Sequence, residues 1–299
     1  MYQTREENPR KVFTKLKVLS LYCGAGGIDE GLKQSGIKTT LAIDINNDCC
    51  ETMKLNHDCE IINGKVKDYE KSLKGFDIIV GGPPCQDFSR ANKNRDFNSC
   101  EIDLFWDLID NIKPKYYLME NVQDVIRVTN RDNYLVNVSD YGVAQDRIRR
   151  IFTNLPLPTT LKKIMMKDVL KQKEYGYLTD FAFPNRNQKC PSRSMESISM
   201  TLTTMKHFYL TPIPIYTRKY LPKDKHIWLN KTKDGLDNGM ICREITNTER
   251  ALLQGFDENY KFFGNECSIR RQIGNAFSPP VTKAFFEQIL LTNKADCPG

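Results

Sequence analysis

The sequence is poor in the residues that build metal centres and covalent cross-links. It contains three histidines and ten scattered cysteines, of which only Cys49 and Cys50 lie close together. Because a zinc site needs several thiolates or imidazoles at short spacing, no metal centre is expected. A disulfide framework is not expected either, since the chain shows no sign of an oxidising compartment.

Long apolar runs are also missing. No stretch approaches the roughly 18 residues that a membrane-spanning helix needs, and the first residues are charged, which argues against a secretory signal. We therefore expect a protein of the cytoplasm, or of the nucleus if the source is eukaryotic or a virus of a eukaryotic host. With 299 residues, of which 40% are hydrophobic, the chain can bury a full core.

The formal net charge is +7, and its location is informative. Residues 161–240 hold 15 lysines and arginines against 7 acidic residues, so this one segment accounts for the whole excess. A concentrated basic segment favours a polyanionic partner such as nucleic acid. A solvated, lysine-rich surface without a partner is the alternative.

Strand-like and helix-like patterns alternate in the first half of the chain, which predicts a doubly wound parallel sheet. Strands are expected at 16–22, 39–43, 76–80 and 116–119, and helices at 48–55 and 102–112. From about residue 156 the sequence becomes rich in lysine and proline, with short strand-like runs at 208–210 and 213–216. Helical periodicity returns at 246–253 and 281–291.

A glycine-rich turn, Tyr22-Cys-Gly-Ala-Gly-Gly27, follows the first expected strand. Glycines let backbone N–H groups and the next helix N-terminus approach an anionic or polar ligand. Asp44 ends the second expected strand about 20 residues after Gly24, where an acidic side chain meets the ribose hydroxyls of a nucleoside cofactor. We predict a nucleotide-like cofactor here; a tight strand–helix turn without a ligand is the alternative.

Cys85 stands apart from the other cysteines. It follows a short β-branched strand and Gly81-Gly-Pro-Pro84, where glycines permit unusual backbone angles and prolines fix φ. Glu120-Asn121 also follows an expected strand, so both sites should face one crevice. A thiol beside a carboxyl group that can carry a proton forms a nucleophile and acid pair. An inert thiol and a structural carboxylate are the alternatives.

Two arginines alternate in Gln145-Asp-Arg-Ile-Arg149 and could share one face of a strand. Guanidinium groups such as those of Arg147 and Arg149 bind phosphate, carboxylate or base carbonyl groups. A solvated basic strand is the alternative.

The order of these motifs resembles that of the DNA (cytosine-5) methyltransferases. The glycine turn, Gly-Pro-Pro-Cys-Gln, Glu-Asn-Val and Gln-x-Arg-x-Arg are followed by the block at 243–256 and by Gly274-Asn-Ala-Phe-Ser-Pro-Pro280. The resemblance implies an α/β, Rossmann-like domain with a doubly wound, mostly parallel sheet, and a smaller, mainly β or irregular target-recognition domain. The expected parts are a catalytic domain at 1–160, a target-recognition domain at 161–242 and a C-terminal segment at 243–299 that returns to the catalytic domain.

The resemblance also implies the chemistry. S-Adenosylmethionine gives a methyl group to carbon 5 of a cytosine in a specific short duplex DNA sequence and leaves as S-adenosylhomocysteine. The Cys85 thiolate adds to carbon 6 of the flipped-out base, Glu120 holds ring N3 and Arg149 contacts O2. Arg147 assists at the cysteine loop, residues 87–100, which closes over the base. No metal is implied.

The cofactor residues that the resemblance implies come from several parts of the chain. Asp44 would bind the ribose and Ile45 the adenine. The other expected contacts are Tyr22, Cys23, Gly24, Ala25, Gly26, Gly27, Val66, Gly82, Pro83, Leu104, Asn275 and Ala276.

We expect a monomer that acts on duplex DNA away from membranes, with a cognate restriction endonuclease as a candidate partner in function. One alternative is the family's tRNA-methylating branch, whose Cys-Phe-Thr signature is absent, since Cys190 is followed by Pro-Ser. The other is an inactive DNA-binding relative. It is suggested by the short stretch between Asn121 and Gln145, where residues 134–138 can supply a strand but the family's helix looks truncated.

Overall fold

The computed structural model describes residues 16–84, 100–127, 129, 131–171, 177–180, 192–202, 208–211, 227–231, 237–241 and 243–295. Cys85, residues 87–99 of the expected loop, Cys190 and the strand-like run at 213–216 therefore lie outside the described residues, as does much of the basic segment.

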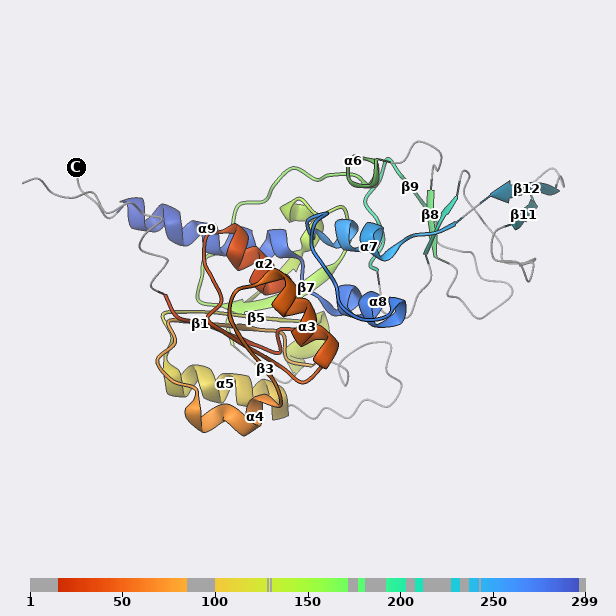
Figure 1. Cartoon of the computed structure of the whole chain (residues 1–299). Helices are drawn as coiled ribbons and strands as arrows, with labels where there is room; N and C mark the ends of the chain where they lie inside the picture. The colour runs from red at the N-terminus through yellow and green to blue at the C-terminus, as the bar shows by residue number, and fades with distance from the viewer. Residues whose placement is uncertain are drawn as a thin grey trace, which may run out of the picture.

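A seven-stranded sheet forms the centre of the protein (Figure 1), with the strand order β3-β2-β1-β4-β5-β7-β6. Neighbouring strands are parallel, except that β7 runs antiparallel to both β5 and β6. This confirms the predicted fold class. The strands are β1 (Val18–Leu21), β2 (Leu41–Asp44), β3 (Glu60–Asn63), β4 (Ile78–Gly81), β5 (Tyr116–Asn121), β6 (Asn133–Asn137) and β7 (Ile148–Thr153).

The strand order reverses between β1 and β4, and ligands of such sheets bind in the crevice at this switch point. Both strands are buried along their whole length and, apart from Ser20, contain no polar side chain, as expected of the centre of a parallel sheet. The register sets Leu21 beside Gly81, and Gly81 beside Met119 of β5. The ends of β1 and β4 are therefore level with Met119, and β5 continues for two more residues, Glu120 and Asn121, which pair with β7.

Helices cover both faces of the sheet (Figure 1). One face carries α2 (Gly27–Gln34), α3 (Asn47–Asn56) and α9 (Pro279–Ala295). The other face carries α4 (Val66–Tyr69) and α5 (Cys100–Ile112). The apolar cores match this division, because Val18 packs with Leu32 and Phe285, whereas Leu19 packs with Phe105.

The connection from β5 to β6 contains a 3-10 turn at Gln123–Arg127 and, within its described residues, no α-helix. This agrees with the predicted truncation. Helix α9 covers the sheet here, because Phe285 stacks on Tyr141 at a ring-centroid distance of 6.4 Å and lies 6.2 Å from Tyr134 of β6. The C-terminal helix thus supplies apolar cover where the connection is short.

A four-stranded sheet with the order β13-β10-β8-β9 lies at one end of the protein. Its strands are β8 (Tyr177–Asp180), β9 (Ser192–Ser194), β10 (Phe208–Thr211) and β13 (Arg243–Glu244), and a separate hairpin contains β11 (Ile227–Lys231) and β12 (Asp237–Ile241). Short helix α6 (Met166–Leu170), α7 (Asn247–Gln254) and α8 (Glu266–Asn275) lie near this end. Strand β13 pairs with β10, so the smaller sheet includes residues beyond 242. The expected division into parts at 1–160, 161–242 and 243–299 remains a prediction.

Glu244 joins the small sheet to the C-terminal helices. Its Oε1 lies 3.0 Å from a guanidinium nitrogen of Arg250 and 3.3 Å from one of Arg270.

No helix in the described part of the chain is both long and apolar enough to cross a membrane.

Candidate active site

The glycine turn leaves β1 at the sheet's switch point with an unusual backbone. Gly24 and Gly26 have φ values of 54° and 74°, and the preceding Tyr22 has a φ of 53°. Such a conformation costs a non-glycine residue free energy and is often found at functional sites. Tyr22 Oη donates a hydrogen bond of 2.7 Å to Glu101 Oε2, from the first turn of α5, which fixes this side chain.

The C-terminal segment packs directly on the turn. A Cβ atom at Gly27 would collide with the carbonyl oxygen of Phe277, so only glycine permits this close approach. Ala276 is buried, and Asn275, the last residue of α8, is exposed. The structure thus brings the two C-terminal residues of the predicted cofactor site close to the glycine turn, which lies about 250 residues earlier in the sequence.

Asp44 lies at the end of β2 and closes the turn from the other side. Its Oδ2 accepts a hydrogen bond of 2.8 Å from Gly24 N–H, and its Oδ1 accepts one of 2.8 Å from Asn46 N–H. Burial raises the pKa of Asp44, whereas these two backbone hydrogen bonds lower it. Each carboxylate oxygen still has lone-pair capacity for a further donor such as a hydroxyl group.

An exposed apolar side chain adjoins this carboxylate. Ile45 is 65% exposed, whereas Val66 and Leu104 are buried. Asn63 Nδ2 donates hydrogen bonds of 3.1 and 2.9 Å to the carbonyls of Asp44 and Ile45, which holds the strand end in place. An exposed isoleucine beside a hydrogen-bonding carboxylate is suited to contact the flat face of a heterocycle.

Glu120 and Arg149 form an ion pair at the end of β5. Arg149 Nε lies 2.8 Å from Glu120 Oε1, and the two side chains are only 15% and 11% exposed. Burial raises the pKa of Glu120 above its usual value, and the guanidinium groups of Arg149 and Arg147 oppose this shift. The carboxyl group therefore tends to carry a proton at a higher pH than a surface glutamate, as a hydrogen-bond donor to a substrate would require.

This pair borders the stretch that leads to Cys85. A Cβ atom at Gly82 would lie 3.4 Å from Glu120 Oε2, and Asn121 Nδ2 donates a hydrogen bond of 3.1 Å to Pro83 O. The Glu120 carboxyl group is thus beside the backbone three residues before Cys85. Cys85 itself lies outside the described residues.

Arg147 occupies a different environment from Arg149. It is 2% exposed, and its guanidinium group donates to the carbonyls of Leu202 (3.3 Å), Gly274 (3.0 Å) and Ala276 (3.3 Å). These contacts connect the residue before β7 to Leu202 and to the C-terminal segment. The predicted contribution of Arg147 at the cysteine loop remains a prediction.

Two buried glutamines extend this junction. Gln145 Nε2 donates to Gln254 Oε1 at 2.7 Å, and Gln254 Nε2 donates to Ala276 O at 2.6 Å. Gln145 Oε1 also accepts from Leu202 N–H at 3.3 Å. The motif Gln-x-Arg-x-Arg therefore supplies two residues that join segments and one, Arg149, that faces Glu120.

Sequence reasoning missed two groups that touch the glycine turn. Glu101 accepts from Tyr22, as described above, and Tyr260 Oη donates a hydrogen bond of 2.6 Å to Ala25 O. Neither residue has a local sequence signal for such a contact, because each reaches the turn from a distant part of the chain.

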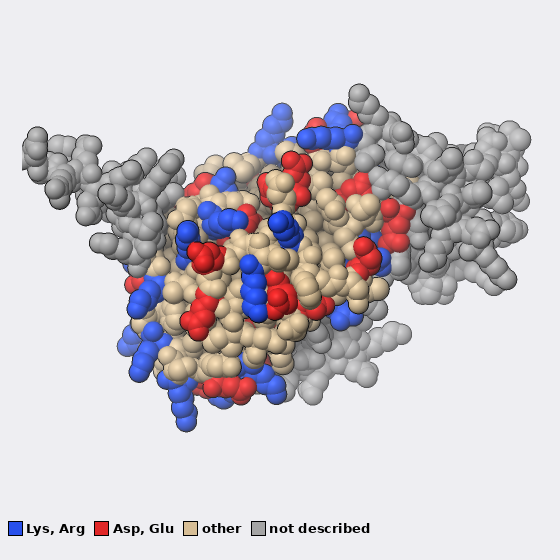
Figure 2. All heavy atoms as spheres, in the orientation of Figure 1, with Lys and Arg blue, Asp and Glu red and all other residues tan. Residues whose placement is uncertain are grey.

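The charges on the viewed face of the described residues are mixed, with basic and acidic side chains interspersed (Figure 2).

Among the side chains that the structure describes, no group of three or more His, Cys, Asp or Glu is placed to hold a metal ion.

Comparison with known proteins finds matches over most of the chain. A family model described as C-5 cytosine-specific DNA methylase matches residues 16–291. The type II methyltransferase M.FnuDI of Fusobacterium nucleatum is 29% identical over 323 residues, covering 90% of this chain and 92% of that protein. M.NgoMIV of Neisseria gonorrhoeae is 27% identical over 336 residues, covering 95% of this chain and 99% of that protein.

Solved structures share the fold. A protein described as a DNA modification methyltransferase encoded within an E. coli prophage superposes with a TM-score of 0.61 at 19% identity, over 95% of this chain and 100% of that one. A mutant of Spodoptera frugiperda DNMT2 gives a TM-score of 0.59 at 18% identity, over 93% and 100% of the two chains.

Proposed function

Because this chain belongs to the C-5 cytosine-specific DNA methylase family and is a DNA (cytosine-5) methyltransferase, we propose that it modifies one cytosine in a specific short duplex sequence through a covalent Cys85 adduct on a flipped-out base. The observation that carries this proposal is the buried Glu120–Arg149 pair beside Gly82 and Pro83. This pair supports the proposal because its carboxyl and guanidinium groups lie next to the stretch that contains the proposed nucleophile.

S-Adenosylmethionine is the cofactor that the family uses, and the residues at the switch point fit it. Asp44 has lone pairs available for ribose hydroxyls, and the exposed Ile45 offers an apolar surface for adenine. At Gly24 the backbone of the turn is open to a ligand, since a Cβ atom there would meet nothing within 4 Å. Tyr22–Gly27, Val66, Gly82, Pro83, Leu104, Asn275 and Ala276 complete the proposed site.

The bound cofactor supplies an electrophilic methyl group. Cys85 as the thiolate forms a bond to carbon 6 of the flipped-out cytosine, which makes carbon 5 nucleophilic. Glu120 hydrogen-bonds ring N3 and Arg149 contacts O2, so the negative charge that develops on the ring is stabilised. After carbon 5 has gained the methyl group it loses its proton, the bond from carbon 6 to sulfur breaks, and the Cys85 thiolate is restored.

The basic segment is proposed to read the DNA. Lysines and arginines between 161 and 242 would bind phosphates and set the affinity, while contacts to base edges in the major groove would set the sequence. We further propose that the protein acts as a monomer and protects the recognition sequence of a cognate restriction endonuclease.

One experiment tests this function. The protein is incubated with methyl-labelled S-adenosylmethionine and either duplex DNA or tRNA, alongside Cys85→Ala and, as a matched control, Cys59→Ala, which replaces a cysteine away from the proposed nucleophile. We expect label in DNA with the wild type and with Cys59→Ala, and none with Cys85→Ala. Methyl transfer to tRNA alone, or to neither substrate, would contradict the proposal.

A second measurement tests the covalent step. Duplex DNA carrying 5-fluorocytosine at the target position should give an adduct that survives denaturing electrophoresis, because fluorine at carbon 5 cannot leave as a proton does. Cys85→Ala should form no such adduct.

A further inference from the structure

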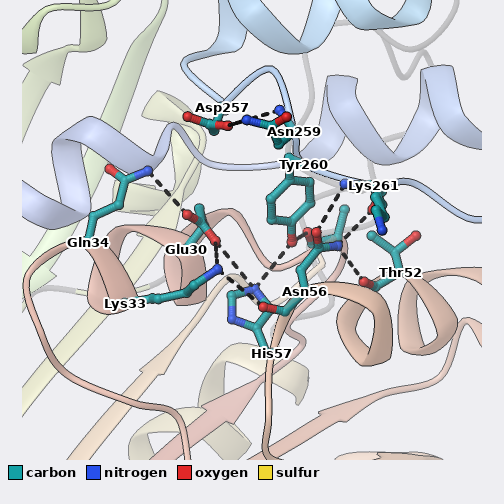
Figure 3. A network of polar contacts seen from close by, with 11 residues as sticks. Glu30, Lys33, Gln34, Thr52, Asn56, His57, Asp257, Asn259, Tyr260 and Lys261 are labelled. Carbon is teal, nitrogen blue, oxygen red and sulfur yellow. Dashed lines mark hydrogen bonds and ion pairs between the residues drawn. The ribbon is translucent and has the colours of Figure 1, made fainter.

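Tyr260 reaches the glycine turn from the C-terminal segment. Its hydroxyl group donates a hydrogen bond of 2.6 Å to the carbonyl oxygen of Ala25, 235 residues earlier in the chain. Figure 3 shows the ring pointing from the segment after α7 toward His57, which directly follows α3.

The direction of each hydrogen bond here follows from counting protons. Tyr260 has one hydroxyl proton, and Ala25 O, which can only accept, takes it. His57 Nε2 lies 3.3 Å from the same hydroxyl oxygen, so His57 is the donor in this second contact. Burial lowers the pKa of His57, assisted by Lys33 and opposed by Asp29 and Glu30, which fits a neutral imidazole with its proton on Nε2.

These contacts fix one peptide unit of the turn at both ends. The carbonyl of the Ala25–Gly26 peptide accepts from Tyr260, and its N–H donates to Cys23 O at 2.9 Å. Peptides next to glycine rotate readily because glycine has no Cβ atom. With both ends bonded, a rotation of this peptide would break two hydrogen bonds at once.

Tyr260 is itself held firmly. Asn56 at the end of α3 clamps the next residue, since its Oδ1 accepts from Lys261 N–H at 3.0 Å and its Nδ2 donates to Lys261 O at 2.7 Å. The ring of Tyr260 lies 4.7 Å from that of Phe256 and 5.2 Å from that of Phe262, centroid to centroid. The phenol is therefore a rigid support for the turn.

We propose that Tyr260 is a positioning residue for cofactor binding, which fixes the Ala25–Gly26 peptide in the orientation that the S-adenosyl ligand requires, with His57 as the donor that orients the phenol. The inference rests on the proposed function, because the ligand of the glycine turn is part of that proposal. In this proposal the C-terminal segment raises the affinity for the cofactor through Tyr260, a residue that need not touch the cofactor.

The test compares Tyr260→Phe with Tyr141→Phe, which alters a buried tyrosine on the α9 side of the sheet. Calorimetric titration with S-adenosylhomocysteine should show about three- to tenfold weaker binding for Tyr260→Phe, the usual effect of one lost hydrogen bond, and wild-type binding for Tyr141→Phe. The KM for S-adenosylmethionine should rise by a similar factor while kcat at saturation changes less.

Two further measurements separate positioning from general stability. In the ligand-free protein, amide hydrogen exchange of a peptide covering the turn should be faster in Tyr260→Phe than in the wild type. His57→Gln, which keeps an N–H donor, should bind S-adenosylhomocysteine more tightly than His57→Leu, which has none.

Unchanged binding of S-adenosylhomocysteine by Tyr260→Phe, within about twofold of a wild-type protein that does bind, would overturn this inference and leave the proposed function standing. A wild-type protein that binds neither S-adenosylmethionine nor S-adenosylhomocysteine would overturn both.

Discussion

Replacing Gly26 with alanine should perturb the turn in two separable ways. The φ of 74° costs an alanine about 1–2 kcal/mol. The new Cβ atom would also collide with Met53 Sδ and lie 2.7 Å from Tyr260 Oη. The thioether of Met53 can move, whereas the hydroxyl group can retreat only by giving up its bond to Ala25 O, at about 1 kcal/mol. We expect a total loss of about 2–3 kcal/mol in the free energy of unfolding.

Gly36 provides the matched control. Its φ is 83°, and a Cβ atom there would meet nothing within 4 Å, so Gly36→Ala should cost only the backbone strain of about 1–2 kcal/mol. Urea denaturation measures both losses, and calorimetry with S-adenosylhomocysteine should show weaker binding for Gly26→Ala alone. In a double-mutant cycle with Tyr260→Phe, the Gly26→Ala cost should fall by about 1 kcal/mol. Equal costs for both alanines, together with an additive cycle, would refute the reasoning.

Three further changes probe the ionic and apolar parts of the site. Burial raises the pKa of Glu120, so the contribution of this side chain to the free energy of unfolding is full at low pH and is lost as pH rises through the raised pKa. Glu120→Gln cannot ionise. The variant should therefore lose methyl transfer and also this pH dependence of the melting temperature. Arg147→Met removes a buried donor from the carbonyls of Leu202, Gly274 and Ala276, of which Ala276 O still accepts from Gln254, and should cost about 3 kcal/mol or more of stability. A fall in kcat at an unchanged melting temperature would instead place Arg147 at the cysteine loop. Ile45→Ser, at a side chain that is 65% exposed, should change stability by less than about 0.5 kcal/mol yet weaken S-adenosylhomocysteine binding measured by calorimetry.

The central strands and the glycine turn were predictable because local patterns determine them. The β-branched run at 78–80 became β4, and the expected strand at 39–43 became β2, which ends at Asp44. The spacing between Gly24 and Asp44 corresponds to a direct hydrogen bond between them. Short apolar runs that end in turn residues leave few other arrangements in an α/β protein.

Several elements escaped prediction, and β3 and α8 are two whose sequences lack a strong apolar period. Strand β3 lies at the edge of the sheet with both end residues exposed, so it shows no buried run. Helix α8 is mostly polar, although Asn265, whose side chain accepts from Ser268 N–H, is an N-cap signal that could have located its start.

The contacts that stiffen the site could not be read from local sequence for a different reason. Tyr260 to Ala25, Gln254 to Ala276 and Arg147 to Gly274 are all bonds from a side chain to a backbone carbonyl. Every residue has a carbonyl, so the acceptor carries no sequence signature, and the pairing depends entirely on how distant segments pack. Their shared feature is that each involves the C-terminal segment.

The two parts of the chain therefore have different roles in the site. The first half supplies the groups proposed to act on the substrate and cofactor, at the ends of β1, β2, β4 and β5. The C-terminal segment holds the backbone of the glycine turn by packing and by a hydrogen bond, since Phe277 packs on Gly27 and Tyr260 donates to Ala25 O. A glycine turn that is open enough to admit a ligand is also free to rotate, and bonds from a separate segment restrict that rotation without filling the ligand's space. Changes in the segment from 255 to 277 should therefore act on cofactor affinity before they act on chemistry.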